Sequence, residues 1–366
     1  MRSLGRAWNG ACELQVELTD NTQLRALLYP KLVGKVGVGD RVSVTTSALH
    51  RGLGTGGYAF VAAVPDRLPP DPVPGPGHIM KARYTPLQSM VASVEEQESP
   101  WHQVLADADD LAGLAVVVAD LHSALPAIVA GARMHAQRHG GPPPRVAYVM
   151  TDGAALPLWF SRTVAALREA DWLAATIAVG QSFGGDYEAV TTHTGLLAAH
   201  HVVGADLVVV AQGPGNVGTG TRWGFSGVAA GEAINAVSVL GGRPIASVRV
   251  SGADPRERHR GISHHSITAF TRVALRPAEV PLPELSGELS EVGRRVAEQA
   301  AAFTTAGHHV TTVPTEGLLS ALAAAPVSMS TMGRSLSQDP ASFLTAGVAG
   351  IRAVTLAGLP DRDQRG

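Results

Sequence analysis

The pattern of apolar and polar positions changes along the chain, and its first part is typical of β-structure. Cys12–Thr19 alternates between polar and apolar residues, and three further short apolar segments follow at Leu24–Tyr29, Arg41–Thr46 and Tyr58–Val64. Alternation of this kind is typical of a half-buried strand, and glycines separate the segments. We therefore predict a small β domain over residues 1–64, built as a barrel or a sandwich.

A proline-rich stretch follows this predicted domain. Pro65–Gly77 contains six prolines, which disfavour both helix and strand pairing and favour an extended, stiff conformation. We therefore predict a linker over residues 65–77 and a second domain over residues 78–366. A shorter proline-containing segment, Pro277–Pro283, is interpreted as a surface loop.

From Gly113 onward, short continuous apolar runs alternate with longer helical patterns. Continuous Val/Ile/Leu runs are typical of buried parallel strands. The predicted strands are Leu114–Ala119, Arg145–Met150, Leu173–Val179, Asp206–Ala211, Pro244–Val250 and His309–Val313, and the predicted helices are Ser123–His139, Trp159–Ala170, Glu188–His201, Val228–Leu240, His265–Val273 and Glu288–Ala306. This alternation predicts a doubly wound, mainly parallel, Rossmann-like α/β domain.

Composition narrows the possible functions. The 366 residues carry a net charge of −2, with 45% hydrophobic and 16% charged residues, which indicates a globular protein without the field that recruits nucleic acid. Cys12 is the single cysteine, so an internal disulfide cannot form, as expected in a reducing cytoplasm. No apolar run approaches the ~18 residues of a membrane span. We expect a cytoplasmic protein with neither a membrane nor a nucleic-acid partner.

Polar residues follow every predicted strand of the second domain. Because the carboxyl ends of parallel strands lie at one edge of a sheet, these residues are expected at that edge, where open α/β sheets bind ligands. Each such residue also fits a plain loop or a helix cap. The residues include Asp120 and His122, Thr151 and Asp152, Gln181 and Ser182, Gln212 and Asn216, Ser251 and Asp254, and Thr315 and Glu316. Their concentration predicts a small-molecule site, with Asp120 and Asp152 as candidate catalytic acids.

A glycine motif follows the fourth predicted strand. Gly213, Gly215 and Gly218 match the dinucleotide pattern G-x-G-x-x-G. A helix should open at once after that pattern, whereas Thr219–Gly227 reads as loop, so no cofactor is assigned. Two interpretations remain: an anion-binding loop, or a loop that bends around two aromatic side chains. The anion-binding loop would use Gly213, Gly215, Asn216, Gly218, Thr219, Thr221 and Arg222; phosphate would then raise the melting temperature, and Arg222→Ala would remove the effect.

A second motif follows the third predicted strand. Gly180-Gln-Ser182-Phe-Gly184 matches the nucleophile-elbow pattern G-x-S-x-G. Asp254 and then His259, His264 or His265 follow later, in the order that α/β-hydrolases use. The segment after Gly184 delays the helix that should begin at the serine. A serine hydrolase using Ser182 is therefore kept as an alternative function.

The densest polar segment is Arg256–His265. Arg256 and Arg258 could bind a carboxylate or phosphate through their guanidinium groups, beside Asp254 and His259 as further ligand-binding residues. His264 or His265 could act as a general acid–base. The histidine spacing matches no standard metal motif, so no metal ligand is assigned. The alternative is a solvated basic loop with one histidine capping the next helix.

The last helical pattern, Ala341–Leu356, is rich in small residues and contains Gly347 and Gly350. Small residues allow close helix packing, within the chain or in a homodimer.

Four segments together carry a resemblance to a known family. They are Gly77–Gln88 (GHIMKARYTPLQ), the GQSFGGD segment, GADLVVVAQGPGNVGTGTRWGFSG and ISHHSITAF. With these segments the chain resembles the domain of unknown function 3866 family, a bacterial family, over nearly its whole length. The resemblance implies no activity and no catalytic residues.

Three hypotheses follow for the function. The first is an enzyme or binder of a small anionic molecule at the carboxyl edge of the sheet. If the protein is an enzyme of this kind, His264, His265, Asp152 and the Gly213–Gly227 loop must share one cleft. The second is the serine hydrolase. The third is a non-catalytic ligand sensor or assembly protein whose β domain contacts a partner.

Overall fold

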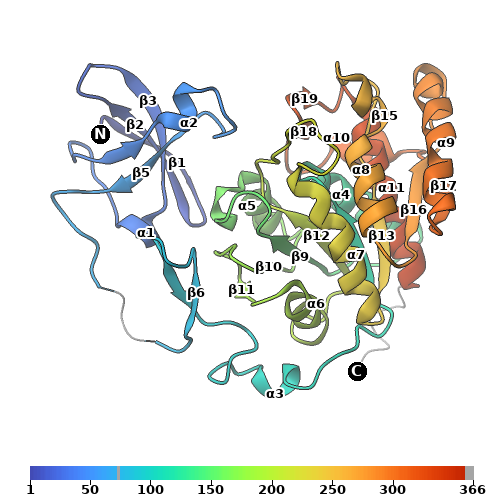
Figure 1. The fold of residues 1–366 in the computed structure, drawn as a ribbon, viewed down its shortest axis with the longest axis horizontal. Coiled ribbons are helices and arrows are strands. Elements are labelled where there is room, and N and C mark those ends of the chain that lie inside the picture. Colours follow the sequence, from blue (N-terminus) through green and yellow to red (C-terminus); the bar gives the residue numbers. More distant parts are fainter. Residues whose placement is uncertain (72–74, 359–366) are drawn as a thin grey trace.

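The computed structural model describes residues 1–71 and 75–358. The chain forms two lobes, an N-terminal β lobe and a larger α/β lobe (Figure 1). Residues 72–74, which belong to the predicted linker, and the last eight residues of the predicted second domain lie outside the described residues.

The N-terminal lobe is a five-stranded sheet with the order β1-β2-β3-β5-β4. Its elements are β1 (Ser3–Trp8), β2 (Ala11–Glu17), β3 (Gln23–Leu28), α1 (Pro30–Val33), β4 (Ser43–Thr45), α2 (Ser47–His50) and β5 (Ala59–Ala63). The predicted β-structure is present, but β1 and β4 occupy opposite edges and do not pair in the described chain. The sheet is open, so the predicted barrel does not close. The pattern also missed β1, because that strand is largely exposed and lacks apolar alternation.

The large lobe contains an eight-stranded parallel sheet, which confirms the predicted fold class. Its spatial order is β11-β10-β9-β12-β8-β13-β16-β17. The strands are β8 (Ala115–Ala119), β9 (Val146–Thr151), β10 (Ala175–Ala178), β11 (Tyr187–Glu188), β12 (Leu207–Gln212), β13 (Arg243–Ser247), β16 (Glu279–Pro283) and β17 (His309–Val313).

Two strands of this sheet, β11 and β16, were not predicted. The interpretation of Pro277–Pro283 as a surface loop was wrong, since Glu279–Pro283 lies between β13 and β17. The β16 strand pairs along its length with β17 but only at Glu279 with β13. Pro281 and Pro283 therefore lie where no β13 residue pairs, so the missing amide donors cost little.

Helices cover both faces of the sheet. One core cluster includes side chains of α4, α5, α10 and α11. The other includes side chains of α6, α7 and α9. The helices are α4 (Leu125–Arg138), α5 (Arg162–Glu169), α6 (Thr192–His201), α7 (Ala229–Val239), α8 (His264–Thr268), α9 (Ser290–Thr305), α10 (Leu318–Ala323) and α11 (Pro340–Ala357). A doubly wound sheet has this arrangement, with left-going and right-going connections on opposite faces.

The final helix α11 packs inside the chain. A Cβ added to Gly131 of α4 would lie 2.0 Å from the Gly347 carbonyl oxygen, and one added to Gly350 would lie 1.9 Å from the Ile128 oxygen. The small residues of this helix thus serve an intramolecular contact. By length and composition α11 could cross a membrane, but 67% of that window is buried within the molecule, which is typical of a core helix.

Aromatic side chains join the two lobes. The indole Nε1 of Trp8 donates a hydrogen bond to the Trp159 carbonyl oxygen over 2.6 Å. The Trp159 ring packs against Tyr29 and against Phe183, and a Cβ on Gly10 would lie 2.2 Å from the Trp159 ring. The β lobe is therefore docked on the carboxyl edge of the large sheet.

The segment after the linker covers the β11 edge of the large sheet. It contains β6 (Ile79–Lys81), β7 (Ser89–Val91) and α3 (His102–Leu105), and Ser93 forms an isolated bridge with Glu188. Lys81 of this segment is fully buried and donates to the carbonyl oxygens of Ser182 and Ala189 over 3.1 and 2.9 Å. Covering an edge strand in this way prevents pairing with other chains. Small hairpins complete the described fold, formed by β14 (Val250–Ser251) with β15 (Gly261–Ile262) and by β18 (Ser330–Thr331) with β19 (Arg334–Ser335).

Candidate functional site

The connections of the sheet reverse direction around β8. The chain leaves β8 through α4 on one face, whereas it leaves the neighbouring strands β12 and β13 over the opposite face. Such a switch point opens a crevice at the carboxyl ends of the strands. Asp120 directly follows β8, and Gln212 and Ser247 are the last residues of β12 and β13, so all three lie at this edge of the sheet. Asp120 and Gln212 were predicted as polar strand exits, whereas Ser247 lay inside a predicted strand.

Asp120 lies at the centre of this edge and is 4% exposed. Its Oδ2 accepts a hydrogen bond from Ser266 Oγ over 3.1 Å, and Gln212 Nε2 donates to its carbonyl oxygen over 2.8 Å. Burial raises the pKa of Asp120 to about 6, although the charge of Arg249 and the Ser266 hydroxyl act in the opposite direction. The carboxyl group can therefore exchange a proton near neutral pH.

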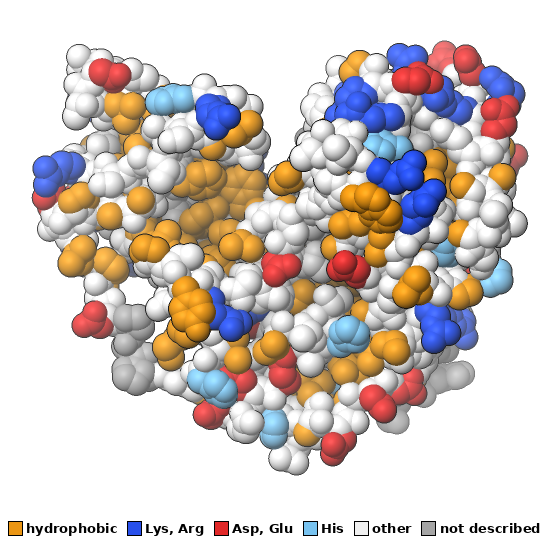
Figure 2. Space-filling view, in the orientation of Figure 1, with side chains coloured by type: hydrophobic (Ala, Val, Ile, Leu, Met, Phe, Trp, Pro, Cys, Tyr) orange, Lys and Arg blue, Asp and Glu red, His pale blue; other side chains and the backbone are white. Residues whose placement is uncertain are grey.

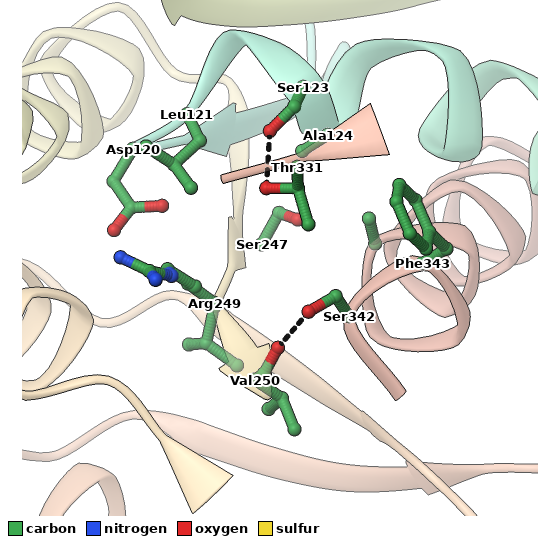
Figure 3. A pocket seen from close by; sticks show the side chains of 12 residues that line it. Asp120, Leu121, Ser123, Ala124, Ser247, Arg249, Val250, Thr331, Ser342 and Phe343 are labelled. Carbon is green, nitrogen blue, oxygen red and sulfur yellow. Dashed lines mark hydrogen bonds between the residues drawn. The ribbon is translucent and has the colours of Figure 1, made fainter. Parts of the chain in front are cut away.

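A small cavity lined by both apolar and polar side chains lies beside Asp120 (Figure 3). Asp120 and Arg249 point toward each other there, and the Ser123 and Thr331 hydroxyls form a 2.9 Å hydrogen bond. Ser247 Oγ has no hydrogen-bond partner among the described residues. The cavity volume is about 20 Å³, which accommodates one water molecule but not a substrate.

A larger cleft of about 340 Å³ lies between the two lobes. Figure 2 shows a hollow between the lobes with apolar side chains gathered on the side of the N-terminal lobe. The cleft combines an aromatic wall with polar groups from the ends of β8, β9 and β12. Its lining includes Trp8, Tyr58 and Phe160, then His122, Ser123, Ser161, Arg162 and Thr163, and finally Gly213, Pro214, Gly215 and Asn216. Its size falls at the lower end of the ~300–1,000 Å³ that is typical of small-molecule sites.

Two side chains in this cleft form a hydroxyl–imidazole pair. His122 Nε2 lies 2.7 Å from Ser161 Oγ, and His122 Nδ1 lies 3.0 Å from the Tyr148 hydroxyl. That hydroxyl donates to the carbonyl oxygens at the end of β12, so it accepts from Nδ1–H and leaves Nε2 to accept from the serine. Burial lowers the pKa of His122 to about 4. Ser161 also caps α5 by accepting from the Val164 amide.

An ion cluster anchors the loop that follows β13. Asp254 is fully buried, and its carboxylate accepts from Arg249, Arg256 and Arg334 over 2.7, 2.9 and 3.2 Å. Burial alone would raise the pKa of Asp254, but hydrogen bonds from Arg256 and the charge of Arg249 hold it well below its usual value. Arg256 and Asp254, two predicted ligand-binding residues, are thus paired with each other.

Three predicted histidines meet beside this cluster. The rings of His259, His264 and His265 have centroids 4.3–5.0 Å apart. The His265 ring is stacked on Phe225 with centroids 4.0 Å apart and an interplanar angle of 4°. Burial, followed by neighbouring positive charges, lowers the pKa of His259 to about 3 and that of His265 to about 4, and lowers the pKa of His264. Each of these shifts favours the neutral imidazole.

The Gly213–Gly227 loop folds back on itself instead of opening a helix. Gly218 bridges Phe225, and the Thr219 and Thr221 hydroxyls bond to each other and to the backbone of Gly224. Asn216 Oδ1 accepts from Gln212 and from Ser226. Thr219 and Thr221 thus hold the turn, Arg222 is exposed, and Gly213, Gly215 and Asn216 line the interdomain cleft.

Ser182 and Asp152 lie apart from the histidines. Ser182 is fully buried, and its hydroxyl donates to the carbonyl oxygens of Met150 and Val179 over 2.9 and 2.6 Å. The Asp152 carboxylate accepts from the Gln181 amide over 2.8 Å. Both side chains stabilise the loop after β10. His265 adjoins Gly218 and Phe225 of the Gly213–Gly227 loop, whereas Asp152 contacts the loop after β10. The described contacts therefore do not bring His264, His265, Asp152 and the Gly213–Gly227 loop into one cleft, as the enzyme hypothesis required.

Three residues of the described site were not predicted to belong to it. Ser161 and Arg162 were placed inside a predicted helix that begins at Trp159, whereas α5 begins at Arg162 with Ser161 as its cap. Arg249 was placed inside a predicted strand. A Ser or Asp directly before a helical pattern is a known cap signal, and it would have identified Ser161.

A scan against protein-family models matches residues 25–350 to the family described as protein of unknown function (DUF3866). The chain belongs to this family. The match includes β5 and the large sheet but neither β1 nor β2, so Trp8 of the cleft lining lies outside the matched residues. No curated protein and no solved structure matches the chain.

Proposed function

We propose that this cytoplasmic DUF3866 protein binds a small anionic molecule in the cleft between its two lobes. The observation that carries the proposal is the position of that cleft, which lies at the switch point of the sheet and is lined by the N-terminal residues of α5. Amides in the first turn of a helix and the helix dipole favour a phosphate or carboxylate. Arg162, whose side chain is 54% exposed and lies 3.7 Å from Glu13 Oε1, supplies a guanidinium group beside them that an anionic ligand could share with Glu13.

The aromatic residues of the lining indicate which other chemical group the ligand carries. Trp8, Tyr58 and Phe160 line the cleft and offer aromatic surface to an apolar or planar part of the ligand. An anion attached to an aromatic ring fits this combination better than a bare anion. The β lobe would then act as the second half of the binding site.

Calorimetric titration of the full chain tests this proposal. We expect phenyl phosphate to bind more tightly than inorganic phosphate, and Arg162→Ala to weaken both by about 10-fold or more, as expected for a lost charge-assisted hydrogen bond. Arg222→Ala is the matched control, since Arg222 is an exposed arginine outside the cleft lining. Equal loss in both variants, or loss in Arg222→Ala alone, would place the anion on the glycine loop and refute the proposal.

A second candidate function is a serine-type hydrolase. The 2.7 Å contact between His122 and Ser161 favours it, because an adjacent imidazole is the usual activator of a serine nucleophile. Ser182 is less suited, since its hydroxyl bonds to two backbone carbonyls. A fluorophosphonate probe should then label Ser161 and not Ser182. Tight binding without turnover or labelling would favour the ligand-sensor hypothesis.

A further inference from the structure

The loop after β13 brings three imidazole rings to one point. One ring nitrogen of each of His259, His264 and His265 lies within 4.8 Å of a ring nitrogen of the other two. His259 and His265 are 1% and 6% exposed. Because buried polar atoms are normally hydrogen-bonded, a cluster of buried ring nitrogens requires partners.

Two of these nitrogens have no partner within the described chain. His264 Nε2 and His265 Nε2 are both buried without a hydrogen bond. The third ring is different, because His259 Nδ1 lies 2.8 Å from Ser263 Oγ. When Nδ1–H donates to that oxygen, the lone pair on His259 Nε2 is left for another partner. The cluster therefore holds three ring nitrogens close together, and two of them, His264 Nε2 and His265 Nε2, have no hydrogen-bond partner among the described residues.

We infer that His259, His264 and His265 form a binding site for a divalent transition metal such as Zn²⁺. Neutral imidazole suits Zn²⁺ and neighbouring first-row metals. Ligands at roughly 2.0–2.1 Å from a tetrahedral metal lie about 3.4 Å apart, so closure from the present separation needs ring movements of about 1 Å. Three protein ligands leave one position open, as in zinc sites that bind water or an anion.

The surroundings are arranged like those of a metal site. Ser263 orients His259 through Nδ1, and its oxygen also accepts from the His265 amide; such outer partners fix the ligand rings. Phe225 holds the plane of the His265 ring. Next to this ring stands Gly218, where an added Cβ would lie 3.5 Å from His265 Cε1, so no side chain projects from that position onto the ring.

The charge nearby determines what would occupy the open position. Arg249 and Arg256 are the cations that act most strongly on the pKa of His259. Both are paired with Asp254. Arg258 is exposed and forms no ion pair in the described part of the chain, and a Cβ on Gly220 would lie 3.7 Å from its Nη2. A metal beside this free guanidinium would carry an anionic fourth ligand. This site uses residues other than those of the interdomain cleft, so the two assignments stand independently.

Titration of the chelator-treated full chain with Zn²⁺ alone tests the inference. We expect one Zn²⁺ per chain, a loss of affinity of at least about 100-fold in His264→Ala, and a loss of about 10–100-fold in Ser263→Ala. His193→Ala, an exposed histidine of α6, is the control and should bind as wild type. Arg162→Ala should also keep Zn²⁺ binding, which separates this site from the cleft.

Substitution with Co²⁺ gives an independent readout, since a tetrahedral Co²⁺ site absorbs strongly in the visible range. This absorption should appear in the wild type and disappear in His264→Ala, while circular dichroism of the metal-free variant reports its fold. If His264→Ala fails to fold, His264→Gln and Ser263→Ala replace it. Absence of one-to-one binding, or binding that is abolished by His78→Ala at the second cluster of possible ligands, His78, Glu96 and Glu98, would overturn the inference.

Discussion

Arg249 Nη2 donates a hydrogen bond to Asp254 Oδ2 over 2.7 Å, and both side chains are buried. The same carboxylate accepts from Arg256 and Arg334, and Arg334 also donates to buried Asp339 over 3.0 Å. Asp254 therefore joins guanidinium groups from three places in the chain. This cluster fixes the loop between β14 and β15. The cluster thereby positions two groups: the segment that ends at His259, and the histidines of α8.

Removal of this carboxylate should destabilise the protein strongly. Asp254→Ala leaves buried Arg249 without its hydrogen-bonded partner, and breaking a buried ion pair costs about 3–5 kcal/mol. Urea denaturation measures the change in the free energy of unfolding. Glu257→Ala is the control, because Glu257 is 71% exposed in its pair with Arg295, and an exposed pair contributes about 0–1 kcal/mol. Similar losses in both variants would refute the structural role of Asp254.

The close approach of α4 and α11 predicts a second stability effect. A Cβ on Gly350 would overlap the Ile128 carbonyl oxygen at 1.9 Å, so Gly350→Ala must push the helices apart and should cost about 1–3 kcal/mol or more. Gly54→Ala is the control, since nothing lies within 4 Å of its added Cβ. A wild-type melting temperature in Gly350→Ala would contradict the packing.

Buried Lys81 should be coupled to Glu188. Lys81 Nζ lies 3.7 Å from Glu188 Oε2 and donates to backbone carbonyls. Lys81→Met leaves these oxygens unpaired and removes the cation beside a buried carboxyl group, so we expect a loss of about 3 kcal/mol. A double-mutant cycle with Glu188→Gln should give a coupling energy of about 0.5–3 kcal/mol. Additive losses would show that the two side chains act independently.

Asp120 should make stability depend on pH. Its pKa is raised by burial to about 6 from the ordinary value of 3.8, so the folded protein binds more protons than the unfolded chain between these values. The stabilisation is complete below about pH 4 and is lost as pH rises through 6. The loss approaches about 3 kcal/mol at pH 8.

The variant Asp120→Asn isolates this contribution, because its side chain stays neutral at every pH. Arg249 and Ser266 face the same carboxyl group, and the control Arg249→Lys keeps the charge beside it. We expect Asp120→Asn to match the wild-type melting temperature near pH 4.5 and to exceed it at pH 8. A constant difference between the two proteins across this range would exclude the raised pKa.

The parallel sheet could be predicted because its central strands are continuous apolar runs, such as Val116–Val118 and Val208–Val210. The strands β11 and β16 could not be predicted. β11 is a two-residue edge strand and is too short to show a period, and Pro281 argues against a strand at β16. Asp120 was predicted from its place after β8. The pairing of Ser161 with His122, 39 residues apart, depends on the order of strands in the sheet, which no local pattern contains. Arg256 was predicted to bind a ligand, but its guanidinium group forms an ion pair with Asp254, two residues earlier.

A crystal structure of the full chain with bound phenyl phosphate would locate the anion. We expect a phosphate group beside Arg162 and the first turn of α5, with the ring against the aromatic residues of the interdomain cleft. A phosphate group bound only at the Arg222 loop or at Arg258, with the cleft containing no ligand, would contradict this expectation.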